Sequence, residues 1–305
     1  MSRPLFSIII PTYDRREQLA ACLQSITALD YPPDRFEVIV VDDGSPQSPE
    51  DILKSFAEVI DLKLLRQPNA GPAAARNRGA ASAQGDFLVF TDDDCLPDQN
   101  WLNAYAKQFS LTALKLIGGQ TVNAAPRNLC SSASQSVIDS VYRYFNTKAH
   151  PLFFATNNLA VPASTFRQLG GFNEQFRTSE DREFCDRWTQ HGHEMIYAPQ
   201  AVCQHRHLLN LKSFWRQHFD YGRGAFHFHR ERKLRNGSRL QPDAGFYLHL
   251  LTSPFIRETG LRRLALTALV CCSQMASTMG FACELLRQIR VEQRARRIDA
   301  TQIAK

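Results

Sequence analysis

The sequence lacks the signatures of several common protein classes. Its eight cysteines form no C-x-x-C pair and share no repeated spacing, which argues against a zinc module and against a secreted disulfide framework. Neither a G-x-G-x-x-G nor a P-loop pattern occurs, so a dinucleotide dehydrogenase and a P-loop NTPase are disfavoured. The apolar stretch at 6–10 is too short for a signal peptide. We therefore expect the body of the protein to stay in the cytoplasm.

The composition is that of a globular protein with one unusual charge distribution. Of the 305 residues, 44% are hydrophobic and 22% are charged, which suits a chain with a buried core. Residues 1–211 carry 19 basic and 23 acidic side chains, whereas residues 212–305 carry 17 and 7. A basic part can attract nucleic acid or an anionic membrane surface. Because apolar sequence is interleaved with these charges, we expect a membrane surface and no nucleic acid.

Short apolar runs alternate with helical patterns through the first half of the chain. Continuous apolar runs suit strands covered on both faces, and they predict strands at 6–10, 36–41, 62–65, 87–90 and 114–117. Helices are predicted at 17–29, 49–60, 73–83 and 99–109, and the glycine pair at 118–119 is expected to break the pattern. The alternation predicts an α/β fold with a mainly parallel sheet, helices on both faces, and ligand sites at the carboxyl ends of the strands.

Three consecutive carboxylates follow the fourth predicted strand. Asp92, Asp93 and Asp94 repel one another, so they need a compensating cation or full solvation. Mg²⁺ or Mn²⁺ binds one or two carboxylates and completes its shell with phosphate oxygens and water, which favours Asp92 and Asp94 as a phosphate-bridging pair. A solvated acidic turn before Pro97 is the alternative.

Four further motifs each allow two interpretations. Asp43 could accept the imide N–H of a pyrimidine base or belong to a plain strand-to-helix turn. Arg76 could pair with a diphosphate, or its small neighbours could simply form a tightly packed helix. Asp181 could act as a general base or only favour a helix dipole. An imidazole at His205 or His207 could complete a metal shell or lie on the surface.

One apolar stretch near the C-terminus reaches the length of a membrane span. Residues 264–283 are twenty consecutive uncharged residues with basic residues on both flanks, and a bilayer core needs about 20. The flanking charges leave the orientation open. We expect a membrane-inserted helix or an in-plane anchor at the cytoplasmic face of the cell membrane, with a buried core helix as the alternative.

Taken together and in this order, the motifs resemble family 2 glycosyltransferases, the inverting enzymes with the GT-A fold. The resemblance covers roughly residues 5–230 and rests on SIIIPTYDR, EVIVVDDGS, NAGPAAARNRG, GDFLVFTDDDCLPDQNWL, GGFNEQF, SEDREFCDRW and the segment 197–207. It implies a GT-A domain over 1–230, with a nucleotide-binding half (1–120) and an acceptor half (121–230). A basic, apolar helical tail over 231–305 would follow as a possible membrane anchor.

The resemblance also implies ligands and residue roles. The donor would be a nucleotide-diphosphate-sugar, the cofactor Mg²⁺ or Mn²⁺, and the acceptor a glycan or a lipid-linked molecule. The donor would be contacted by Pro11, Tyr13, Asp43, Arg76, Asp92 and Asp93, the first three around the base. Asp94 and His205 would hold the metal, with His207 close enough to replace the histidine.

The expected reaction is the transfer of a single sugar. Asp181 falls where the family places its catalytic base, with Glu180 as the second choice, and one displacement at the anomeric carbon would invert its configuration. Processive members carry Q-x-x-R-W after this region, whereas Gln217 is followed by Asp220 and Tyr221 at those positions. A nonprocessive enzyme is therefore expected.

The resemblance further implies that side chains in the loops between 118 and 170 choose the donor sugar and the acceptor. Asn157 and Asn158 could face either sugar, although asparagines commonly serve only in turns. A single side chain in such a loop can change which sugar is preferred.

Two functions other than sugar transfer are less consistent with the sequence. A non-catalytic, membrane-tethered nucleotide-sugar-binding protein would require the loss of Asp94 or Asp181, and both are present. Sugar nucleotidyl transfer needs a glycine-rich, basic loop after the first strand, and 11–16 does not resemble one. The catalytic transferase is the favoured interpretation.

Overall fold

The computed structural model describes residues 5–111, 114–146, 153–237 and 243–303, with side chains described as far as 293. The chain divides into two compact units, Met1–Leu208 and Leu209–Lys305, which are described separately. This boundary comes before a long helix at Leu211–Asn236, whereas the boundary expected from the sequence, at residue 230, lies inside that helix.

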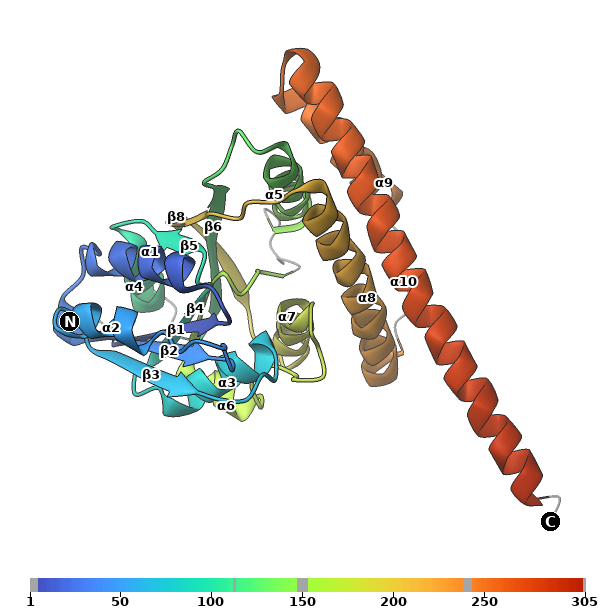
Figure 1. Cartoon of the computed structure of the whole chain (residues 1–305), viewed down its shortest axis with the longest axis horizontal. Helices are drawn as coiled ribbons and strands as arrows, with labels where there is room; N and C mark the ends of the chain where they lie inside the picture. Colours follow the sequence, from blue (N-terminus) through green and yellow to red (C-terminus); the bar gives the residue numbers. More distant parts are fainter. Residues whose placement is uncertain (1–4, 112–113, 147–152, 238–242, 304–305) are drawn as a thin grey trace. The chain divides into compact units, whose positions relative to one another are not determined.

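An eight-stranded mixed sheet forms the centre of the first unit (Figure 1). Its order is β3-β2-β1-β4-β7-β6-β8-β5. The strands are β1 (Phe6–Thr12), β2 (Phe36–Asp42), β3 (Leu62–Arg66), β4 (Phe87–Thr91), β5 (Cys95–Pro97), β6 (Leu116–Asn123), β7 (Asn158–Pro162) and β8 (Met195–His205). β1 to β4 are mutually parallel, β6 is parallel to β8, and β7 and β5 pair antiparallel with their neighbours. The predicted α/β fold with a mostly parallel sheet is confirmed.

Helices cover both faces of this sheet. They are α1 (Arg16–Thr27), the short η1 (Pro33–Arg35), α2 (Glu50–Ala57), α3 (Pro72–Ser82), α4 (Trp101–Leu111), α5 (Leu129–Val141), η2 (Tyr142–Asn146), α6 (Ala163–Gln168) and α7 (Glu180–Gln190). Ile8 and Ile10 of β1 pack in one apolar core with α1 and α4, whereas Ile9 packs in the other core with α3, α6 and α7. Successive side chains of a strand point to opposite faces, and both faces are covered, so β1 and β2 are mainly apolar; the buried Ser7 and Glu37 are hydrogen-bonded to each other (2.6 Å).

The predicted strand at 114–117 is wrong in extent, because the glycine pair does not break it. β6 begins at Leu116 and runs through Gly118 and Gly119 to Asn123. A Cβ at Gly118 would lie 2.0 Å from the ring of Phe154, and one at Gly119 would lie 2.3 Å from the carbonyl oxygen of Ala201. These glycines are therefore positions of close packing inside the sheet.

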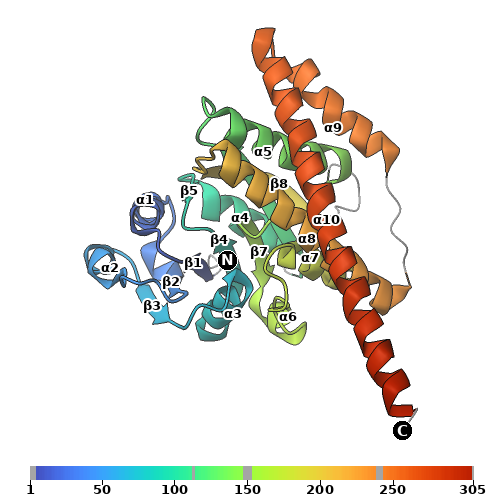
Figure 2. The same ribbon diagram turned by 45° about the vertical axis from the view of Figure 1, so that its right-hand side comes forward.

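Three helices form the second unit: α8 (Leu211–Asn236), α9 (Ala244–Arg257) and α10 (Gly260–Ile303). α10 runs alongside α8 and α9 in both ribbon views (Figures 1 and 2). α8 starts with a capping box at Asn210 and ends at Gly237, which has a left-handed φ of 67°. α8 and α10 approach closely where Gly222 faces the backbone of Ser277 and Gly280 faces that of Phe219.

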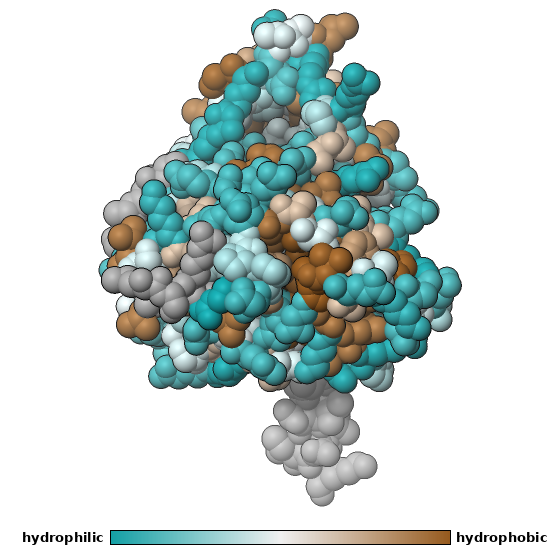
Figure 3. Space-filling model, turned by 90° about the vertical axis from the view of Figure 1, so that its left-hand side faces the viewer, coloured by the Kyte–Doolittle hydropathy of each residue, from teal (hydrophilic) through white to brown (hydrophobic). Residues whose placement is uncertain are grey.

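Exposed apolar side chains are concentrated in the second unit. Among the described residues, 13 of the 22 exposed large apolar side chains belong to α9, α10 and the turn between them. By contrast, the face of the molecule drawn in Figure 3 is mostly hydrophilic, with apolar side chains in small separate groups. The segment 260–293 of α10 is long and apolar enough to cross a membrane. Only 28% of its most apolar stretch is buried within the protein.

Candidate active site

The acidic loop between β4 and β5 is neutralised by side chains from other elements. Asp93 is buried, accepts a hydrogen bond from the Thr12 hydroxyl (2.8 Å) and pairs with Arg15 (3.1 Å). Arg15 also pairs with Asp94 at 3.0 Å. Burial raises the pKa of Asp93 to about 6, although the charge of Arg15 opposes this. The expected repulsion among the carboxylates is thus partly compensated within the protein.

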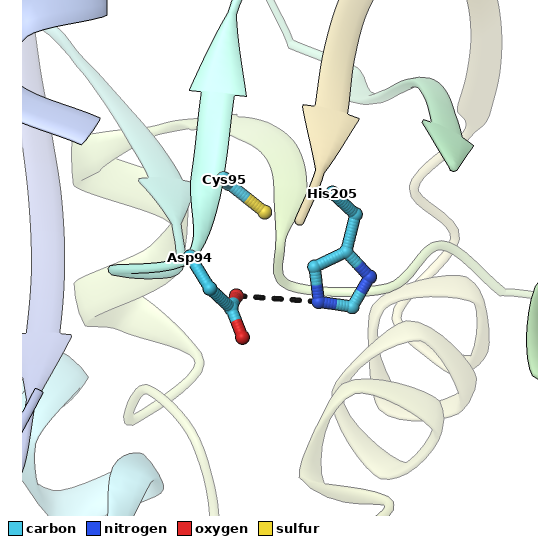
Figure 4. A group of neighbouring side chains, drawn as sticks. All are labelled: Asp94, Cys95 and His205. Atoms are coloured by element: carbon cyan, nitrogen blue, oxygen red, sulfur yellow. Dashed lines mark ion pairs between the residues drawn. The ribbon is translucent and has the colours of Figure 1, made fainter. Parts of the chain in front are cut away.

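Asp94 lies beside His205 and Cys95 at the junction of β5 and β8 (Figure 4). The Nε2 atom of His205 is 3.2 Å from Oδ1 of Asp94, and the ligand atoms of the three residues lie within 4.8 Å of one another. Burial disfavours both charged forms, but the close approach of the two opposite charges outweighs it, so the pKa of Asp94 falls to about 2 and that of His205 rises.

The two candidate histidines occupy different positions. His205 faces Asp94, whereas the ring of His207 lies 5.0 Å from that of His205, tilted by 30°, and does not belong to the three-residue cluster. Burial and the neighbouring charge of His205 lower the pKa of His207 to about 4. The arrangement brings His205, and not His207, to the acidic loop.

Arg76 connects the acidic loop to α7. Its guanidinium donates to Asp92 (2.5 Å) and to Glu180 (2.8 Å), and the side chain is buried. The next residue on α3, Asn77, exchanges two hydrogen bonds with the backbone of Phe172, which fixes the segment that leads into α7. The first turn of α7 is therefore held beside the end of β4.

Asp181 lies at this fixed helix start. It is half-buried and accepts a hydrogen bond from the backbone N–H of Arg182 (2.7 Å). Burial raises the pKa of Asp181 and raises that of Glu180 to about 7, although Arg76 opposes both shifts. Ser179 adopts a left-handed φ of 70° and its side chain does not cap the helix. Glu180, Asp181 and Glu183 occupy the first turn of α7, where carboxylates are favoured by the helix dipole.

Asp43 organises the loop that leads into α3. Its carboxylate accepts hydrogen bonds from Gln67 Nε2 (2.8 Å) and from the backbone N–H groups of Ala70 (2.9 Å) and Gly71 (2.8 Å). At the end of the neighbouring β1, Pro11 is half-buried and Tyr13 is 48% exposed. The residues expected around a base thus lie at the carboxyl ends of adjacent parallel strands.

Sequence reasoning missed Arg15 and Cys95. Arg15 follows β1 within the SIIIPTYDR segment, and its position next to the expected base-binding residues was the available signal. Cys95 is adjacent to Asp94, but its proximity to His205 depends on pairing between β5 and β8.

The idea that Asn158 faces a sugar is wrong. Its Oδ1 accepts hydrogen bonds from Trp101 (2.8 Å) and Tyr105 (2.7 Å), and its Nδ2 donates to two backbone carbonyls. All of its polar atoms are therefore used within the core. Asn157 is half-buried, and its Oδ1 accepts a hydrogen bond from Thr121 at 3.2 Å.

The sheet order and the polar strand ends correspond to a fold of the GT-A type, and comparisons with known proteins identify the family. Residues 7–161 match the family described as Glycosyl transferase family 2, and residues 87–286 match Glycosyl transferase family group 2. The chain belongs to glycosyltransferase family 2 and is a glycosyltransferase.

Curated relatives and solved structures resemble most of the chain. Glycosyltransferase AglE of Haloferax volcanii is 29% identical over 66% of this chain and 67% of its own length. The pre-mycofactocin glycosyltransferase of Mycobacterium tuberculosis is 29% identical over 72% of this chain and 46% of its own, so the chain spans about half of that relative.

Two solved structures share the fold over nearly the whole chain. The mannosyltransferase PcManGT of Pyrobaculum calidifontis, in complex with GDP-Man and Mn²⁺, has a TM-score of 0.63 at 20% identity and covers 95% of this chain and 81% of its own. S. aureus TarS 1–349 in complex with UDP-GlcNAc has a TM-score of 0.54 at 18% identity and covers 93% and 92%.

Proposed function

We propose that this protein is an inverting, metal-dependent glycosyltransferase that moves one sugar from a nucleoside-diphosphate-sugar to a hydroxyl of a glycan or lipid-linked acceptor. The observation that carries the proposal is the bridge made by Arg76. It joins Asp92, at the donor side, to Glu180 of the helix that carries Asp181. The buried side chain of Arg76 thereby holds the proposed base close to the acidic loop of the proposed donor site.

The residues at the acidic loop fit a divalent cation. Oδ1 of Asp94 is buried and makes no geometrically sound hydrogen bond, although it lies in ion-pair range of His205. A carboxylate and an imidazole are common ligands of such ions. We propose Asp94 and His205 as the holders, and Mg²⁺ or Mn²⁺ bound there would neutralise charge on the leaving diphosphate.

Asp181 acts as the general base in this proposal. The raised pKa keeps the carboxylate basic enough to accept the proton of an acceptor hydroxyl as that oxygen attacks the anomeric carbon. Arg182 stabilises the ionised form through its backbone N–H and its charge. Glu180 is paired with Arg76 and serves to hold the helix, which makes it the second choice for the base.

The donor is bound at the carboxyl ends of β1, β2 and β4. The exposed ring of Tyr13 is free to stack on a base, with Pro11 and Asp43 beside it. Arg15 is 47% exposed on its side chain and can turn from Asp93 and Asp94 toward a diphosphate. The donors in the titles of two structural neighbours, GDP-Man and UDP-GlcNAc, support this ligand class.

We also propose that the second unit attaches the enzyme in the plane of a membrane surface. The exposed apolar residues Leu264, Met275, Met279, Leu286 and Ile289 recur at helical spacing along α10, and basic residues lie at both ends of this stripe. α8 packs along α10 and carries Asp220 and Arg223. Spanning a bilayer would place those charges in hydrocarbon at high cost, so in-plane attachment is favoured.

Donor binding tests the metal site without an acceptor. In calorimetry, UDP- or GDP-sugar should bind more tightly with Mn²⁺ than without it, and Asp94→Asn should abolish that difference. Asp98→Asn, an exposed carboxylate a few residues along, is the matched control and should behave like the wild type. Equal binding with and without metal in the wild type would contradict the metal role.

A further inference from the structure

A thiol completes a mixed set of metal ligands next to the acidic loop. Cys95 and His205 are register partners in the antiparallel pair of β5 and β8, so the sheet itself places their side chains together. Asp94 precedes Cys95, and its carbonyl oxygen accepts the backbone N–H of Arg206 (2.8 Å), which fixes the loop to the end of β8. Figure 4 shows the sulfur and the carboxylate both directed toward the imidazole.

The three donor atoms differ in the ions that they prefer. They are one carboxylate oxygen, one sulfur and one imidazole nitrogen, all within 4.8 Å of one another. Mg²⁺ and Mn²⁺ prefer oxygen ligands, whereas thiolate and imidazole favour Zn²⁺, Co²⁺ and related ions. Three protein ligands with a fourth position left for water or phosphate is a recurrent arrangement for zinc.

We propose that Cys95, together with Asp94 and His205, forms a site for a thiophilic divalent cation of the zinc class. On binding, the thiol gives its proton to solvent and a sulfur–metal bond forms. Because Asp94 and His205 are also the proposed holders of Mg²⁺ or Mn²⁺, the two kinds of ion compete, and the zinc-class ion is an inhibitor. Only this competition rests on the proposed function; the thiophilic site itself does not.

Cobalt absorption tests the site directly, because a Co²⁺–thiolate bond gives a charge-transfer band in the near ultraviolet. The test uses the full-length, reduced protein with Cys271, Cys272 and Cys283 changed to Ser, since these three thiols are at least partly exposed and would bind cobalt themselves. In that background we expect one thiolate band that saturates with Co²⁺ and disappears when Zn²⁺ is added. Cys95→Ser should remove the band.

Cys203→Ser is the matched control. Cys203 is a fully buried cysteine of β8 that interacts with the Cys95 thiol and with Thr91 but lies outside the three-residue cluster. The band should persist in this variant. Thermal unfolding of both variants shows whether each is folded, and a calorimetric Zn²⁺ titration supplies a second measurement. We expect Cys95→Ser to weaken Zn²⁺ binding at least about tenfold, as loss of a metal-supporting group does, and to weaken Mn²⁺ binding less.

The outcomes separate this proposal from the proposed function. Cobalt binding without a thiolate band, no cobalt binding at all, or a band that survives Cys95→Ser in a folded protein would overturn the thiophilic site. A normal band in a protein that neither binds nor cleaves any nucleotide-sugar would support the site and overturn the transferase mechanism instead.

Discussion

At the scale of single residues, the structure gives two adjacent carboxylates different surroundings. Glu180 is buried and paired with Arg76, whereas Asp181 is half-buried and accepts only a backbone hydrogen bond among the bonds described for it. The partnered carboxylate positions the helix, and the other is available to an acceptor hydroxyl. This assignment gives different expectations for the two residues.

We predict that Asp181→Asn lowers kcat about 10²- to 10⁴-fold, the usual contribution of a general base, while donor affinity stays near the wild-type value. Glu180→Gln keeps an oxygen that can accept from Arg76, so its kcat should fall far less. Steady-state kinetics and donor calorimetry on both variants make the comparison. A larger loss in Glu180→Gln than in Asp181→Asn would reverse the roles.

The pH profile offers a second test of the base. Because burial raises the pKa of Asp181, the acid limb of kcat/KM should lie above the ordinary aspartate value, with activity lost as the pH falls through it. The charge of Arg182 lowers that pKa, so Arg182→Gln should move the limb to higher pH with little change at the plateau. An unmoved limb would show that another group controls it.

Arg76 is predicted to matter for stability as well as for geometry. Arg76→Met would leave Asp92 and Glu180 without their shared cation, and removing one partner of a buried ion pair costs roughly 3–5 kcal/mol. Arg78→Met removes an exposed arginine from the same helix and should change little. Urea unfolding of the two variants is the measurement, and equal stabilities would contradict the bridging role.

At the scale of elements, the first four strands were predictable and the later strands were less so. The predicted runs at 6–10, 36–41, 62–65 and 87–90 are strands within one or two residues, because β1, β2 and β4 are buried and mainly apolar and the edge strand β3 keeps three leucines. β5 has only three residues, and β8 contains a proline and a register shift opposite Gly119 and Gln120. A strand of three residues carries no such signal, and in β8 the irregularity divides the apolar sequence into two short stretches.

The same limit applies to the candidate site. The sequence could identify candidate ligand-binding residues, namely Asp92, Asp94 and His205, because each is a polar residue at a strand end within a family-like segment. The partners of Arg76 and Arg15 were not, because they lie 16 to 104 positions away in the chain and are brought close only by packing. These ion-pair partners can be identified only from tertiary contacts and not from the spacing of residues in the sequence.

The packing of α8 on α10 gives a prediction at this scale. A Cβ at Gly222 would lie 1.9 Å from the carbonyl oxygen of Ser277, so Gly222→Ala must push the helices apart. We expect a loss of about 1–3 kcal/mol, as for other overpacked sites, seen as a lower thermal midpoint. Ala282→Met enlarges an exposed position on α10 and should leave the midpoint unchanged. Unchanged stability of Gly222→Ala would rule out this contact.

At the scale of the whole molecule, catalysis and attachment are assigned to different units. The residues proposed for catalysis all lie within 1–208, and the apolar stripe with its basic flanks lies in 209–305. Such a division would place a soluble-type active site at a lipid surface, where a lipid-linked acceptor is found.

Vesicle flotation tests the attachment. We predict that the protein floats with anionic vesicles, less well with neutral ones and less well at high salt, because basic side chains supply part of the affinity. Met275→Glu with Met279→Glu should abolish flotation. Leu111→Glu makes the same change at an exposed position of α4 and should not. Wild-type flotation of the double variant would contradict attachment through α10.

The most direct test of the central claim is the release of nucleoside diphosphate from a panel of UDP-, GDP- and dTDP-sugars, with and without Mn²⁺ or Mg²⁺. Slow hydrolysis of the donor requires no acceptor. The account predicts metal-dependent release from one class of donor and its loss in Asp94→Ala. No release from any donor, combined with no metal-dependent nucleotide binding, would contradict the proposed mechanism.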